Sequence, residues 1–256
     1  MILKTLVTAA AATVLAGTAH AQSSQTPPEG ARNVVLVHGA FADGAGWRGV
    51  YDELTAKGYR VSVVQNPLTS LADDVAATQR VLARQDGPTI LVGHSWGGTV
   101  ITQAGNDPKV VGLVYVAAFL PDAGESTADQ LAKIPPPPNF VVDPQPDGFG
   151  FINSEKFKAG FAADTTDADA AYLRDSQVPI ALAAFADKVA VAAWRTRPSW
   201  AVIPSEDGAI DPRLLRQMAE RAGAQATEVG GASHVVFLTQ PKAVAAVIES
   251  AARAAR

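Results

Sequence analysis

The chain has 256 residues, a formal net charge of -4 and no cysteine. The length suits one α/β domain with a substantial core, and the acidic balance provides no basic surface of the kind that binds nucleic acid. Without cysteine the chain can form no disulfide, no thiolate metal site and no lipid-modified cysteine anchor.

The N-terminal residues 1–21 have the pattern of a cleaved secretory signal peptide. Lys4 gives a positive start, the apolar stretch 6–16 follows, and Ala-His-Ala at 19–21 is a small-x-small cleavage site. The apolar stretch is too short to span a bilayer, which takes about 20 apolar residues, so we expect no membrane anchor. Residues 22–30 then predict a flexible leader before a domain over 31–256. The expected location of the protein is a periplasm or the medium.

Strand and helix signals alternate along the rest of the chain. Short apolar or β-branched runs predict strands at Asn33–Val37, Arg60–Gln65, Thr89–Val92, Val111–Val116, Trp200–Ile203 and Ala226–Val229. Helix-sized segments lie at Trp47–Lys57, Leu71–Arg84, Gly98–Gly105, Pro212–Ala222 and Pro241–Ala254. The alternation predicts an α/β fold with a mostly parallel, doubly wound sheet covered by helices on both faces. Such sheets bind ligands beyond the carboxyl ends of their strands.

The stretch from about 121 to 198 interrupts this alternation. It contains four consecutive prolines at 135–138, a loop-like Asp-Pro-Gln-Pro-Asp-Gly at 143–148, and helical pieces around 156–162 and 168–174. Because strand signals resume after it, we interpret the stretch as an inserted, mainly helical cap over the strand ends. Its many aromatic residues either pack the cap onto the sheet or line an apolar pocket.

A serine between two glycines follows the third predicted strand directly and precedes a helix. The sequence is Gly93-His94-Ser95-Trp96-Gly97, a G-x-S-x-G pattern. In this context the turn is so sharp that only glycine fits two residues before and after the serine, whose hydroxyl is then held at the helix N-terminus. The pattern predicts that Ser95 is a nucleophile.

A serine hydroxyl needs a base, and His234 stands where the order serine, acid, histidine requires it. It follows the last predicted strand, whereas His38 ends the first strand and the side chain of His94 should point elsewhere. The acid should follow the strand before, where Asp207 is our choice over Glu206. Asp207 would hold the histidine in its productive tautomer and stabilise the imidazolium.

Negative charge that develops on a substrate oxygen needs hydrogen-bond donors. The backbone N–H of Trp96, at the start of the helix, is one predicted donor. The second is predicted from the loop after the first strand, at Ala40, with Phe41 as the alternative, since Gly39 lets the backbone approach closely.

A second glycine motif has the spacing of dinucleotide-binding proteins. Gly44-Ala45-Gly46-Trp47-Arg48-Gly49 matches G-x-G-x-x-G, but the strand before it ends seven residues earlier, and no acidic residue ends the next strand. We therefore predict no dinucleotide cofactor. No histidine–carboxylate cluster has metal-ligand spacing either, so no metal is expected.

These motifs together resemble the α/β-hydrolase superfamily, and within it the small esterases similar to plant methyl-salicylate esterases and hydroxynitrile lyases. The resemblance runs over nearly all of residues 22–256. Its motifs are Leu36-Val37-His38-Gly39-Ala40-Phe41, the Ser95 motif, Ala118-Phe119-Leu120-Pro121, Pro198-Ser199-Trp200 and Gly231-Ala232-Ser233-His234. The lyases use a lysine near the catalytic histidine, and here none follows His234 before Lys242. Lyase chemistry therefore has little support. Dehalogenases of this fold carry aspartate in place of Ser95, so the serine argues against carbon–halogen cleavage.

The resemblance implies hydrolysis of a small-molecule carboxylic ester through an acyl-enzyme on Ser95. Ester is preferred to amide on the resemblance alone. Two alternatives stay open. One keeps Ser95 but performs perhydrolysis or hydrolysis of a carbon–carbon bond. The other is a ligand-binding protein that has kept a hydrolase fold and turns over little.

Overall fold

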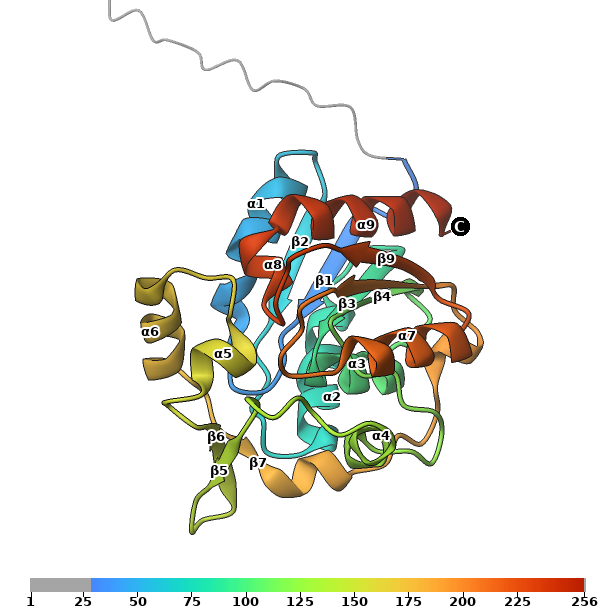
Figure 1. The fold of residues 1–256 in the computed structure, drawn as a ribbon. Coiled ribbons are helices and arrows are strands. Elements are labelled where there is room, and N and C mark those ends of the chain that lie inside the picture. Colours follow the sequence, from blue (N-terminus) through green and yellow to red (C-terminus); the bar gives the residue numbers. More distant parts are fainter. Residues whose placement is uncertain (1–28, 256) are drawn as a thin grey trace, which may run out of the picture.

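The computed structural model describes residues 29–255, so the predicted signal peptide and most of the leader lie outside the described residues. A six-stranded parallel sheet in the order β2-β1-β3-β4-β8-β9 forms the centre (Figure 1). The strands are β1 (Asn33–Val37), β2 (Arg60–Val64), β3 (Thr89–His94), β4 (Val110–Val116), β8 (Ser199–Pro204) and β9 (Gln225–Val229). The predicted fold class is confirmed, with small shifts at the strand ends.

Helices cover both faces of this sheet (Figure 1). One layer contains α1 (Arg48–Thr55) and α9 (Pro241–Ala254), and the other contains α2 (Leu71–Ala83), α3 (Trp96–Ala104) and α7 (Pro212–Arg221). Strands β1 and β3 are buried along their whole length because they are covered on both faces, whereas the edge strand β9 is largely exposed. No helix among residues 29–255 is long and apolar enough to cross a membrane.

The order of the strands reverses between β1 and β3. After β1 the chain crosses to β2 on one side and then returns to β3 on the other side of β1. The loops that follow β1 and β3 therefore diverge, and this point of an α/β sheet is where ligands bind.

Local sequence signals account for several helix boundaries. The side chain of Ser70 accepts a hydrogen bond from the backbone N–H of Asp73 and caps α2. Asp211 caps α7 before Pro212, as predicted, and Gly223 beyond its end has a φ of 63°. One correction concerns α3, which begins at Trp96, directly after the serine, instead of at Gly98.

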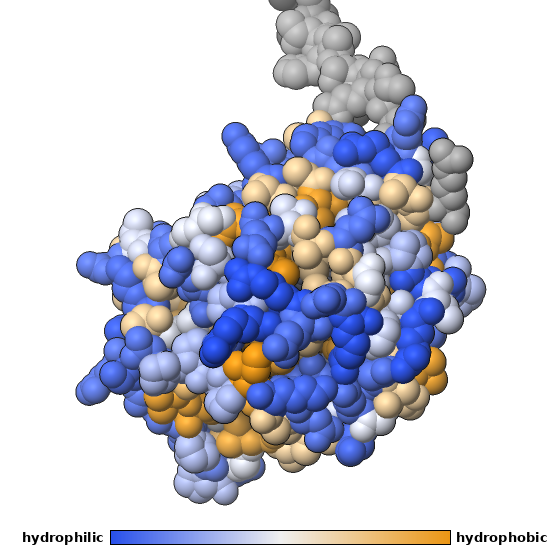
Figure 2. Space-filling model, turned by 45° about the vertical axis from the view of Figure 1, so that its right-hand side comes forward, coloured by the Kyte–Doolittle hydropathy of each residue, from blue (hydrophilic) through white to orange (hydrophobic). Residues whose placement is uncertain are grey.

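The inserted segment lies beside the carboxyl ends of the strands (Figure 1). Its helices are α4 (Thr127–Lys133), α5 (Phe157–Phe161) and α6 (Asp167–Asp175), and its short 3-10 helices are η2 (Leu182–Ala186) and η3 (Ala193–Arg195). It also contains an antiparallel sheet of β5 (Val142–Pro144), β6 (Phe149–Ile152) and β7 (Ile180–Ala181). The exterior of the molecule is largely hydrophilic, with small apolar patches, in the view of Figure 2.

Two features of this cap differ from the sequence-based prediction. The stretch 143–148 is not a plain loop: it is the turn and one edge of the β5–β6 hairpin, where the N–H of Gln145 donates to the carbonyl of Phe149. The third strand of this sheet, β7, is remote in the chain, so the local sequence pattern gave little indication of the strands. Helix α4 was also missed, although Ser126 and Asp129 form a capping box at its start.

Candidate active site

Ser95 occupies the turn between β3 and α3 with a φ of 53° and a ψ of -121°. Residues other than glycine rarely adopt positive φ, and such strain persists only where the surroundings hold it. The flanking glycines explain how the turn closes. A Cβ atom on Gly93 would lie 2.5 Å from the carbonyl oxygen of Gly97, and one on Gly97 would lie 2.6 Å from that of Val37. The predicted sharp turn is therefore present, and its glycines are required by packing.

Ser95 lines an apolar cavity of about 310 Å³. Of the described residues that line this cavity, Ser95 alone has a polar side chain. The walls come from the loop after β1, through Ala40 and Phe41, and from the cap, through residues such as Phe140 and Phe161. We call it the serine cavity. An apolar chamber around one hydroxyl suits the binding of an apolar group next to a reacting atom.

The buried side chains of Asp207 and His234 contact each other. The Nδ1 atom of His234 lies 2.8 Å from Oδ2 of Asp207, and the two side chains are 1% and 0% exposed. The other carboxylate oxygen of Asp207 accepts the backbone N–H groups of Ala209 and Ile210 at 2.8 and 2.9 Å. The carboxylate is therefore fixed in place, so that Nδ1 of the imidazole carries the proton and Nε2 is left as the basic nitrogen. Glu206 is exposed to solvent.

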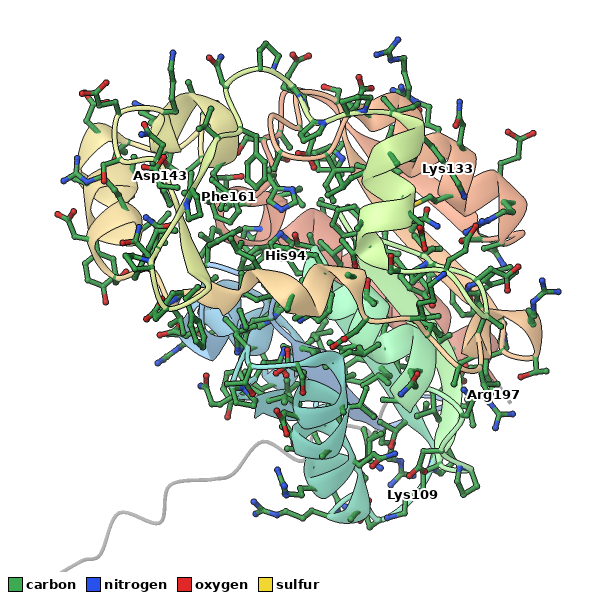
Figure 3. The ribbon with its side chains drawn as sticks, turned by 90° about the horizontal axis from the view of Figure 1, so that it is seen from below. His94, Lys109, Lys133, Asp143, Phe161 and Arg197 are labelled. Atoms are coloured by element: carbon green, nitrogen blue, oxygen red, sulfur yellow. The ribbon has the colours of Figure 1, made fainter. Side chains whose placement is uncertain are left out.

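His94 supports the loop that carries His234. Its Nε2 lies 3.0 Å from the backbone carbonyl oxygen of His234, and the two rings are 4.7 Å apart. Burial lowers the pKa of His94 well below its usual 6.5, so its ring is neutral. Figure 3 shows His94 near the centre of the molecule. The ring of His94 therefore contacts the backbone of the His234 loop.

His38 holds the loop after β1. Its Nε2 accepts the backbone N–H of Asn66 at 2.8 Å, and its Nδ1 then donates to the carbonyl of Gly39 at 2.8 Å. The side chain of Asn66 also donates to the carbonyl of His38 at 2.9 Å. Burial lowers the pKa of His38, which keeps it neutral. The pattern fixes the backbone just before the two predicted donors, Ala40 and Phe41.

The predicted oxyanion donors lie next to Ser95. Trp96 is the first residue of α3, where backbone N–H groups have no partner within the helix. Ala40 and Phe41 both line the serine cavity, and Phe41 has a φ of 62°. The choice of Ala40 over Phe41 stays a prediction.

Sequence reasoning missed a buried carboxylate behind the nucleophile turn. Asp74, in the first turn of α2, accepts the indole N–H of Trp96 at 2.7 Å and the backbone N–H of Leu68 at 2.8 Å. Its side chain is fully buried, and this burial raises its pKa to about 6. The only sequence signal was an acidic residue on a buried helix face, which does not identify its partners.

The second glycine motif has a structural explanation. Gly44 begins the 3-10 helix η1 (Gly44–Trp47) and donates its N–H to the side chain of Gln65 at 3.1 Å. A Cβ atom on Gly46 would lie 2.9 Å from the ring of Phe237, and one on Gly49 would lie 3.0 Å from Pro241. These glycines permit close packing within the fold. No cluster of three or more potential metal ligands occurs among residues 29–255.

A parallel sheet with a serine on a strained strand-to-helix turn, beside a buried His–Asp pair, defines the class of α/β hydrolases. Comparison with protein families agrees, since the profile of the alpha/beta hydrolase family matches residues 34–247. The chain belongs to this family, and the superfamily resemblance in the sequence motifs is confirmed.

Among curated proteins, the chain is similar to a carbendazim-hydrolysing esterase of a Nocardioides species, with 34% identity over 119 residues, 41% of this chain and 49% of that protein. It is also similar to a pyrethroid hydrolase of Sphingobium wenxiniae, with 32% identity over 158 residues, 52% of this chain and 55% of that protein. The matches span about half the length of these relatives.

Among solved structures, an extracellular α/β-hydrolase from a Paenibacillus species has a TM-score of 0.72 and 20% identity, over 86% of this chain and 99% of that one. That protein is described as sharing structural and functional homology with tobacco salicylic acid binding protein 2. At this identity the likeness concerns the fold.

Proposed function

We propose that the protein is a serine hydrolase that cleaves small carboxylic esters through an acyl-enzyme on Ser95. The observation that carries the proposal is the 2.8 Å contact between the fixed carboxylate of Asp207 and Nδ1 of His234, in a loop that His94, the neighbour of Ser95, contacts at 3.0 Å. The named activities of the two curated relatives and the match to the alpha/beta hydrolase family support a hydrolytic reaction.

In the first step, Nε2 of His234 takes the proton of the Ser95 hydroxyl while Oγ forms a bond to the ester carbonyl carbon. The bond from that carbon to the alcohol oxygen then breaks, and the same proton passes from His234 to the leaving alkoxide. In the second step, His234 deprotonates water, which attacks the acyl-enzyme, and the carboxylic acid leaves as Ser95 regains its proton. Asp207 stays ionised and stabilises the imidazolium in both steps.

The carbonyl oxygen gains negative charge in each step and needs preorganised donors. The backbone N–H of Trp96 and that of Ala40 would supply them. Close packing at Gly93 and Gly97 and the hydrogen bonds of His38 fix the two backbone segments in advance. Preorganised donors stabilise the transition state without a cost of reorganisation during the reaction.

The test combines turnover with labelling. Hydrolysis of p-nitrophenyl acetate and butyrate is measured for wild type and Ser95→Ala, and mass spectrometry then locates the adduct of a fluorophosphonate. We expect turnover that the variant lacks, and modification of Ser95 that His234→Ala abolishes. Labelling of another residue would overturn the assignment of the nucleophile. Absence of turnover above Ser95→Ala across a broad ester panel would favour a ligand-binding protein.

A further inference from the structure

A second cavity, of about 490 Å³, lies beside the serine cavity. Phe41 and Phe161 line both cavities, so the two chambers share a wall. The ring of Phe161 also packs 5.0 Å from the ring of His234. The shared wall therefore lies beside His234, the proposed base, while Ser95 lines the serine cavity.

The second cavity is on the side of His234. Its walls include Val235 and residues of α8 (Val236–Thr239), which follow His234 directly in the chain, and Leu173 of α6 is part of the cap wall. Tyr172, also in that wall, is 72% exposed, so the chamber opens to solvent. Helices α5 and α6 of the cap both contribute lining residues, and they lie at the edge of the molecule, away from the central sheet (Figure 1).

The chemistry of acyl transfer distinguishes the two chambers. An ester has an acyl arm and an alcohol arm, which extend in different directions from the carbonyl carbon. The protonated histidine must reach the leaving oxygen, so the alcohol arm lies on the histidine side. Leaving alcohol must also depart before water attacks, which an opening to solvent permits. The apolar serine cavity, which Ser95 itself lines, then holds the acyl arm.

The lining of the second cavity also carries negative charge. Its wall is largely apolar, but Asp43, Asp164 and Asp169 stand in it, and none of the described lining residues is Lys, Arg or His. Asp164 is used structurally, since it accepts the hydroxyls of Ser233 and Thr239 and ties the cap to the His234 loop. Asp43 and Asp169 are exposed: the carboxylate of Asp43 accepts the backbone N–H of Ala45, and that of Asp169 accepts the hydroxyl of Thr166 at the start of α6. Their charge repels an anionic group in this chamber and attracts a cationic one.

We propose that the second cavity binds the alcohol arm of the substrate, and that this arm is bulky and either uncharged or cationic. The assignment rests on the proposed esterase function and names the substrate class for that same site. It implies two independent selectivities, one for acyl size in the serine cavity and one for alcohol size and charge in the second cavity.

Size is tested with one blocking variant in each cavity. Leu173 lines the second cavity only and Leu131 lines the serine cavity only, so Leu173→Trp and Leu131→Trp are matched fillings. The ratio of kcat/KM for 3,3-dimethylbutyl butyrate over methyl butyrate reports on the alcohol arm. The ratio for methyl octanoate over methyl acetate reports on the acyl arm. We expect Leu173→Trp to lower the first ratio by about tenfold and Leu131→Trp to lower the second.

Charge is tested with three butyrates of similar shape. Their alcohols are choline, its uncharged isostere 3,3-dimethylbutanol, and an anionic sulfopropanol. In wild type we expect the choline ester to be favoured over the sulfopropyl ester. Asp43→Asn with Asp169→Asn should reduce that preference by about fivefold, as should added salt. Asp147→Asn with Glu155→Gln removes two exposed carboxylates that line neither cavity and should leave the preference unchanged.

The outcomes separate the two proposals. One outcome is that esters are hydrolysed through Ser95 while Leu131→Trp, and not Leu173→Trp, lowers the ratio that reports on the alcohol arm. In that case, or if both double variants change the charge preference equally, the alcohol site is elsewhere. The esterase function then stands. If wild type hydrolyses no ester above Ser95→Ala, the esterase function fails and the alcohol site with it.

Discussion

The carboxylate of Asp74 accepts the indole N–H of Trp96 at 2.7 Å, behind the turn that presents Ser95. The same carboxylate accepts the N–H of Leu68, whose own carbonyl accepts the N–H of Ala181 in cap strand β7. One buried group thus connects the residue after the nucleophile with the attachment of the cap. Trp96 supplies a proposed oxyanion donor, so Asp74 is a positioning residue for it.

The raised pKa of Asp74 makes stability depend on pH. In the unfolded chain this carboxyl ionises with an ordinary pKa of 3.8, and in the folded protein with a pKa of about 6. Between these values the folded state holds the extra proton, so the contribution of Asp74 to stability falls as pH rises. Relative to Asp74→Asn, the free energy of unfolding of wild type should fall by about 2–3 kcal/mol from about pH 4 to pH 7. Urea unfolding of both proteins across this range measures the difference. Parallel curves would contradict it.

Removal of the indole N–H should disturb both stability and catalysis. Trp96→Phe keeps the backbone donor but leaves one oxygen of buried Asp74 without its partner, at a cost of about 2–3 kcal/mol. The backbone of Trp96 would then be held less firmly, and we expect kcat to fall about tenfold with little change in KM.

Trp200→Phe is the matched control for this loss. The Nε1 atom of Trp200 is buried and has no hydrogen-bond partner among residues 29–255, so the same truncation there removes no bond. A double variant with Asp74→Asn should lose less than the sum of the single losses. Equal losses for the two tryptophan variants would show that packing alone is responsible.

The choice of acid is tested by neighbouring substitutions. Asp207→Asn would place an amide N–H opposite Nδ1 of His234, favouring the wrong tautomer, and should lower kcat by about 10⁴-fold. Glu206→Gln changes an exposed neighbour and should leave kcat nearly unchanged. Ester hydrolysis by the three proteins, with circular dichroism as a check of folding, decides the point. A large loss of kcat in Glu206→Gln would show that Glu206, and not Asp207, is the acid that supports His234.

Two buried neutral histidines should weaken the fold in acid. Burial lowers the pKa of both His38 and His94, so below 6.5 the unfolded chain binds protons that the folded protein does not. Each contribution to stability is complete above 6.5 and is lost as pH falls below it, by at most about 1.4 kcal/mol per pH unit. His94→Gln can still donate to the carbonyl of His234 and should reduce this slope. An unchanged slope in denaturant titrations would disprove the role of His94.

Export is the remaining prediction from the N-terminal sequence. When the full sequence is expressed in a Gram-negative host, a cleaved protein should appear in the periplasm or medium, with the mass of a chain whose first residue is Gln22. Replacement of Ala19 and Ala21 by bulky residues should block this cleavage while the enzyme keeps its activity. A cytoplasmic protein of full mass in both cases would rule out the signal peptide.

The sequence alone determined the sheet, the turn at Ser95 and the order of serine, acid and histidine. These features depend on local chemistry: apolar runs for buried strands, glycines on both sides of the serine, and Asp211-Pro212 before a helix. Tertiary structure decided what depends on contacts between distant segments. It placed Asp207 instead of Glu206 against His234, paired β6 with β7 in the cap, and brought Asp74 to Trp96. The two chambers that meet at Phe41 and Phe161 likewise arise only when the cap folds onto the sheet, because no local pattern encodes which side chains face one another across a cavity.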